Sequence, residues 1–251
     1  MRSTCRTMLL ALLAVLALSA VAASAAQAAV EGPFYKIAGS RLASGESKEV
    51  KITTRSGIDL YLDIYGTYIK CTTQGFAAGS KLLGSTGANG GAGEVTLELS
   101  GCKYSGDGSG ECGVVEPIKT YPLTAKLVYL NSERKGRLAV EFTPTKGSKF
   151  GRITITGKGC AEETYITGDL VAGLYSGEKP VEVGKEPAEA KTMELDLTLS
   201  PQPADVWVEK AGELVKTAVG ELDYGPGGLQ FTEGTNSTLE LAGGANWGVF
   251  T

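Results

Sequence analysis

The side chains that could carry out chemistry in this chain are carboxylates, tyrosines and cysteines, because its 251 residues include no histidine. Without histidine the chain cannot build Ser-His-Asp or Cys-His nucleophile pairs, histidine metal sites or the usual near-neutral acid and base. The sequence also contains no G-x-S-x-G nucleophile elbow and no phosphate-binding P-loop. Paired carboxylates, as in a glycoside hydrolase, are therefore the main remaining route to catalysis.

Four acidic residues lie in segments that alternate between apolar and polar residues, as strands do: Asp63, Glu98, Glu141 and Asp169. Acidic side chains are common on the outward faces of strands, so we interpret these four as surface residues and predict no catalytic residue. The alternative is a carboxylate-dependent hydrolase that acts on extracellular or cell-wall polysaccharide. Two acidic residues converging in a cleft, one of them with a raised pKa, would favour that alternative.

Three neighbouring tyrosines, Tyr61, Tyr65 and Tyr68, form the candidate ligand surface. Aromatic rings in such a group can stack on a sugar or a peptide, although ordinary packing between strands explains them equally simply. We therefore expect a partner, if there is one, to be a cell-envelope glycan or a protein.

A calcium loop is the one metal site that the sequence suggests. Asp107, Ser109 and Glu111 place oxygen atoms at alternate positions beside glycines. No glutamate follows at the spacing that completes an EF-hand loop, so we interpret the segment as a solvated turn. The sequence thus predicts no metal and no cofactor.

Four of the five cysteines are spaced too widely for a zinc site, which normally contains a close C-x₂-C pair. We predict that all four form disulfides. Four cysteines allow three connectivities, and we favour Cys102–Cys112, closing a hairpin, together with Cys71–Cys160, joining distant strands. The four residues are Cys71, Cys102, Cys112 and Cys160.

The N-terminus has the pattern of a cleavable secretory signal: Arg2 and Arg6, an apolar run from Met8 to Leu18, and then small residues. We predict that residues 1–28 are removed, since the apolar run is short for a membrane span of about 20 residues. The mature chain loses two of 24 basic residues and none of 28 acidic ones, which leaves a formal charge of −6. That charge argues against a nucleic-acid partner. We expect an extracellular protein with no membrane span after cleavage.

The rest of the chain alternates with a period of two in many short segments, such as Val95–Leu99 and Met193–Leu199. Glycine-rich or polar turns separate about a dozen such segments, including a turn at 131–136. Segment 205–221 fits either a helix or two strands, and we favour a hairpin that turns at 211–212. This spacing predicts an all-β protein, an antiparallel β-sandwich or a barrel-like fold. We expect a disulfide-bonded β domain over 29–175 and a loop or linker over 176–191. The strands of 192–251 would complete that domain or form a small second β unit.

Several short motifs resemble those of uncharacterised secreted β proteins common in soil actinobacteria. They are the alanine-rich signal, "IKC" at Ile69–Cys71, "LSGC" at Leu99–Cys102, "GEC" at Gly110–Cys112 and "GKGC" at Gly157–Cys160. The resemblance implies export and an all-β fold, and no particular activity. Together with the missing catalytic motifs, it leads us to expect a secreted, non-enzymatic structural or binding protein.

Overall fold

The computed structural model describes residues 32–53, 58–62, 67–85, 89–105, 112–160, 162–185, 189–197, 199, 202–220, 222–224, 227–234 and 237–251. Within these residues the chain forms 23 strands and no helix, and the strand pairings are antiparallel. The all-β prediction is confirmed. The predicted signal peptide, residues 1–28, lies outside the described residues.

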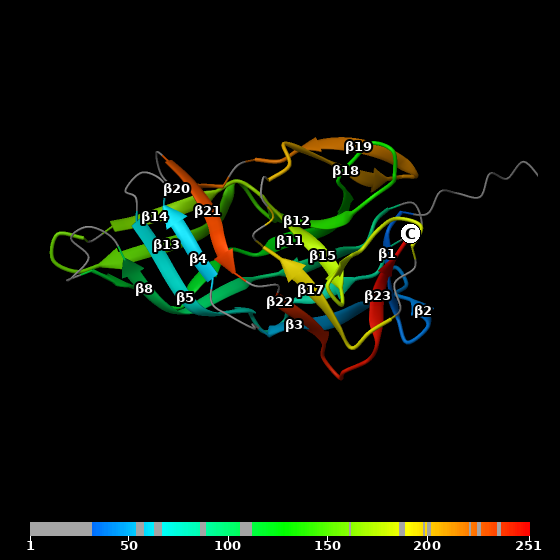
Figure 1. The fold of residues 1–251 in the computed structure, drawn as a ribbon, viewed down its shortest axis with the longest axis horizontal. Helices are drawn as coiled ribbons and strands as arrows, with labels where there is room; N and C mark the ends of the chain where they lie inside the picture. Colours follow the sequence, from blue (N-terminus) through cyan, green and yellow to red (C-terminus); the bar gives the residue numbers. More distant parts are fainter. Residues whose placement is uncertain are drawn as a thin grey trace, which may run out of the picture.

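Eight strands form a first closed ring, at the left of Figure 1. Their order around it is β10 (Ile118–Thr120), β8 (Leu97–Ser105), β5 (Thr67–Phe76), β4 (Ile58–Leu62), β21 (Gly227–Gly234), β20 (Asp223–Tyr224), β14 (Glu162–Thr167) and β13 (Lys149–Thr156). The ring closes because β10 pairs with both β8 and β13. One further short strand, β9 (Gly113–Val114), pairs with β13.

Eight other strands close a second ring, in the centre of Figure 1. Their order is β12 (Leu138–Pro144), β15 (Leu170–Ser176), β17 (Thr192–Asp196), β22 (Ser237–Leu241), β3 (Ser47–Thr53), β6 (Lys81–Leu83), β7 (Ala92–Val95) and β11 (Leu123–Tyr129). Pairing of β11 with β12 closes it. Of the two forms predicted, the barrel-like one therefore describes the fold, since the rings leave their member strands without free edges.

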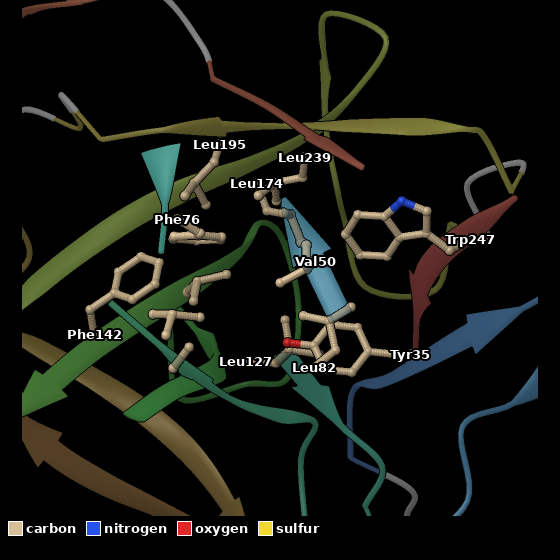
Figure 2. A pocket seen from close by; sticks show the side chains of 13 residues that line it. Tyr35, Val50, Phe76, Leu82, Leu127, Phe142, Leu174, Leu195, Leu239 and Trp247 are labelled. Atoms are coloured by element: carbon tan, nitrogen blue, oxygen red, sulfur yellow. The ribbon is translucent and has the colours of Figure 1, made fainter. Parts of the chain in front are cut away.

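Smaller elements surround the second ring. The hairpin of β18 (Asp205–Lys210) and β19 (Glu213–Ala218) attaches to β11, and β16 (Lys179–Pro180) pairs with β15. A separate three-stranded sheet contains β2 (Ser40–Arg41), β1 (Phe34–Ile37) and β23 (Trp247–Phe250). Its Tyr35 and Trp247 side chains point into the second ring (Figure 2).

The chain passes back and forth between the two rings, so neither ring is a continuous segment of sequence. Strand β3 belongs to the second ring, β4 and β5 belong to the first, and β6 and β7 belong to the second again. The chain alternates between the rings in this way as far as β22. The strands after residue 191 are part of the same two rings as the earlier strands, since β17 pairs with β15 and β22 pairs with β3. Segment 176–191 contributes β16 and the buried side chain of Val181.

Alternation of apolar residues explains the packing of both rings. Leu123, Ala125 and Leu127 of β11 point into the second ring, and Ile153 and Ile155 of β13 are buried in the first. Burying each large aliphatic side chain contributes about 1.5–3 kcal/mol. The predicted hairpin at 211–212 is confirmed: Ala211 and Gly212 have φ values of 54° and 81°, as a two-residue turn with φ above zero at both positions requires.

The two predicted disulfides are present, but the connectivity that we favoured from sequence is wrong. Cys71 is bonded to Cys102, and Cys112 is bonded to Cys160. Cys71 and Cys102 are direct partners in the β5–β8 register. Cys112 precedes β9, which pairs with the end of β13, and the turn after β13 contains Cys160. Strand neighbours in space decided the pairing, whereas our prediction used closeness along the sequence.

Candidate functional site

The candidate tyrosine surface is only partly within the described residues. Tyr61 on β4 and Tyr68 on β5 are direct partners across the two strands, and the Tyr68 side chain is 44% exposed. Tyr65 lies outside the described residues. The fold therefore brings two of the three positions opposite each other on the first ring.

The four candidate carboxylates are not gathered at one open site. Asp63 lies outside the described residues. Glu98 on β8 forms an ion pair with Lys119 on β10. On the second ring, Asp169 precedes β15, and its Oδ2 accepts a hydrogen bond of 3.0 Å from the Gly220 N–H. Glu141 on β12 is the residue whose environment is unusual.

Glu141 is 1% exposed, and its two carboxylate oxygens accept no hydrogen bond from the described residues. It lies directly opposite Lys126 on β11 and Val171 on β15. Burial raises the pKa of Glu141 and the charge of nearby Asp169 raises it further, whereas Lys126 lowers it. Two carboxylates thus converge and one has a raised pKa, but a side chain this deeply buried cannot meet a polysaccharide.

The calcium candidate, Asp107, Ser109 and Glu111, lies outside the described residues. Among the residues that are described, no cluster of three or more acidic or cysteine side chains is arranged to hold a metal ion.

The second ring encloses a small apolar cavity between β1, β23 and the ring strands (Figure 2). The space left for the centre of a water molecule is about 20 Å³, which is enough for about one water. Its lining includes Tyr35, Val50, Leu82, Leu127, Phe142 and Trp247. The cavity is therefore a packing gap, too small to hold a sugar or a cofactor.

The first ring carries an exposed aromatic pair that sequence reasoning missed. Tyr121, which follows β10, and Tyr165 on β14 are each 38% exposed, and their ring centroids are 6.5 Å apart. The Tyr121 N–H donates to the Phe150 carbonyl of β13, which holds the residue beside β14. Lys149 Nζ lies 3.3 Å from the centroid of the Tyr165 ring, a cation–π contact.

Charged side chains continue this surface across the ring. Lys119 on β10 is the direct partner of Arg152 on β13, and Arg152 is in turn the direct partner of Tyr165 on β14. Nη1 of Arg152 also lies 3.4 Å from Oε1 of Glu163 on β14, and the two side chains form an ion pair. We call this surface the tyrosine–lysine face, and it consists of Lys119, Tyr121, Lys149, Arg152 and Tyr165.

A sequence signal for the tyrosine–lysine face exists, but it is incomplete. Alternation along 149–156 and 162–167 places Arg152 and Tyr165 on outward positions. The register that sets them side by side comes only from the pairing of β13 with β14 and of β10 with β13.

Comparison with protein-family models, curated proteins and solved structures gave no match. None of the described segments forms a helix with the length and apolar character that a membrane crossing requires. The two disulfides indicate an oxidising compartment, where such bonds form and persist.

Proposed function

We propose that this chain is an exported, non-enzymatic protein that acts by binding, at the cell surface or outside the cell. The signal pattern of residues 1–28 and the two disulfides support export. The resemblance to secreted β proteins of actinobacteria agrees with it. The sequence led us to expect either a structural or a binding role. The exposed aromatic pair favours binding over a purely structural role.

The observation that carries the proposal is the outer surface of the first ring, where an exposed aromatic pair lies beside a lysine. The cavity of the second ring has room for about one water molecule. Glu141, the one described carboxyl group with a raised pKa, is buried and out of reach of solvent. Neither this cavity nor Glu141 could receive a substrate, whereas the outer surface of the first ring presents aromatic and charged side chains.

A screen of the purified, exported protein tests this function. It combines binding to a glycan array and to cell-envelope preparations with an assay for newly released reducing ends. We expect saturable binding to at least one ligand and no release of reducing ends. Failure to bind any of these ligands would contradict the proposal.

The alternative, a carboxylate-dependent polysaccharide hydrolase, rests on the convergence of Glu141 and Asp169. It would replace our proposal if the protein released reducing ends and if both Glu141→Gln and Asp169→Asn abolished that activity. The matched control is Glu133→Gln, because Glu133 lies in the exposed turn between β11 and β12.

A further inference from the structure

We propose that the tyrosine–lysine face binds a polysaccharide whose sugars carry carboxylate groups. This inference rests on the proposed binding function and names the class of ligand. It is carried by the arrangement of Tyr121 and Tyr165 and of the neighbouring cations on β10 and β13.

Tyr121 and Tyr165 supply an apolar platform that water covers in the free protein. The rings are tilted by 35° with their centroids 6.5 Å apart, so together they offer one continuous surface. The apolar C–H faces of sugar rings pack on such aromatic surfaces, while hydroxyl groups at the sugar edge stay hydrated. Tyr165 lies on β14 of the closed ring, and the Tyr121 N–H donates to the Phe150 carbonyl of β13, so little order has to be imposed on binding.

The charge near this platform is positive, although the mature chain as a whole is negative. Strands β8, β10, β13 and β14 contain four cationic residues and three acidic ones: Lys103, Lys119, Lys149, Arg152, Glu98, Glu162 and Glu163. Lys119 is paired with Glu98, and Arg152 with Glu163.

Lys149 differs from these paired cations, because its ammonium group lies over the Tyr165 ring rather than beside a carboxylate. The ammonium group covers one face of the Tyr165 ring, so a sugar packed on the exposed part of the Tyr121–Tyr165 pair would place a carboxylate beside this cation. The N–H groups of the Lys149 ammonium that do not face the ring can donate hydrogen bonds to the carboxylate of the sugar. The contact with Lys149 therefore favours an acidic sugar over a neutral one.

A peptide partner fits the face less well. An extended peptide usually joins a sheet through a free edge, and β10, β13 and β14 have neighbours on both sides in the closed ring.

Titration of the exported protein with sodium polygalacturonate tests the inference, with neutral dextran as the comparison polymer. We expect polygalacturonate to bind and added salt to weaken the binding, because exposed charges are screened. Tyr165→Ala should weaken the binding by about tenfold, as loss of an aromatic anchor commonly does, and Tyr165→Phe should keep most of it. Lys149→Met should weaken it several-fold and reduce its dependence on salt.

Two matched controls separate this face from general effects. Val215→Ala removes an exposed apolar side chain on β19, and Lys216→Met removes an exposed lysine on the same strand. Both should bind like the wild type, and circular dichroism should show the same fold for every variant.

The outcomes distinguish this inference from the proposed function. Binding of polygalacturonate that Tyr165→Ala and Lys149→Met leave unchanged would overturn the assignment to this face and would leave the binding function standing. Equal binding of dextran, or binding only to other ligands, would overturn the acidic class. Absence of any ligand in the wider screen would overturn both.

Discussion

Arg134 and Glu209 form a two-point ion pair that joins the β11–β12 turn to the β18–β19 hairpin. Nε of Arg134 lies 3.0 Å from Oε2 of Glu209, and Nη2 lies 2.8 Å from Oε1. The same Nη2 donates to the Gly212 carbonyl in the hairpin turn. Because the Glu209 side chain is fully buried, its charge depends on Arg134 for compensation.

We expect Arg134→Met to destabilise the protein by about 2–4 kcal/mol, because it leaves a buried carboxylate without its cation. Urea unfolding followed by fluorescence measures the change. Lys135→Met is the matched control: its exposed ammonium group pairs with Glu133 on the surface, and we expect a change within about 0.5 kcal/mol. Equal unfolding midpoints for the two variants would contradict this role of the ion pair.

The buried carboxyl of Glu141 should make stability depend on pH. Burial raises its pKa in the folded protein above the ordinary glutamate value of 4.5. The folded state therefore holds the proton more tightly than the unfolded state does. Its contribution to stability is complete below the unfolded pKa and is lost as pH rises through the higher folded pKa.

Replacement of this carboxyl tests that dependence. The free energy of unfolding of Glu141→Gln should exceed that of the wild type by more at pH 7 than at pH 4. The measurement is urea unfolding across this pH range, with the exposed-residue variant Glu133→Gln as the control. Parallel wild-type and Glu141→Gln curves would show that the folded protein does not hold this proton.

Peptide mapping without reduction should recover the cross-linked pairs Cys71–Cys102 and Cys112–Cys160. The bonds close loops with sequence separations of 31 and 48 residues, for which the chain-entropy model gives about 4 kcal/mol each. Replacing both members of a pair with serine should therefore lower the unfolding free energy by about that amount. We expect the larger loss for Cys71 and Cys102, because both are buried in the core. A recovered Cys102–Cys112 peptide would contradict the register of β5 and β8.

Gly91 should tolerate no larger side chain, because it lies against Leu127 of β11 and Tyr35 of β1. A Cβ atom there would lie 2.8 Å from Leu127 Cδ1 and 2.9 Å from Tyr35 Cε2. We expect Gly91→Ala to cost about 1–3 kcal/mol through overpacking. Gly75→Ala on β5 is the control, since its nearest atom would be the Ile52 carbonyl oxygen at 3.9 Å. Thermal unfolding compares the two, and an unchanged melting temperature for Gly91→Ala would contradict this packing.

Local patterns in the sequence were sufficient for the strand content and for several hairpins. The polar turn at 131–136 and the Ala211-Gly212 turn both join the strands that alternation predicted around them. About a dozen strands were expected and 23 are described. The difference comes partly from elements such as β2, β9, β16 and β20, in which two residues are too few to show alternation.

By itself, the sequence determined that this chain is an all-β protein with its four later cysteines in disulfides. Those features depend on residue type and on a two-residue period, which a linear chain displays directly. Only the tertiary structure decided which strands are neighbours. That choice set Cys71 against Cys102, buried Glu141 on the side of β12 that faces away from the ring interior, and placed Tyr121 beside Tyr165. The physical reason is that strand pairing joins residues far apart in the chain, so no local pattern specifies it.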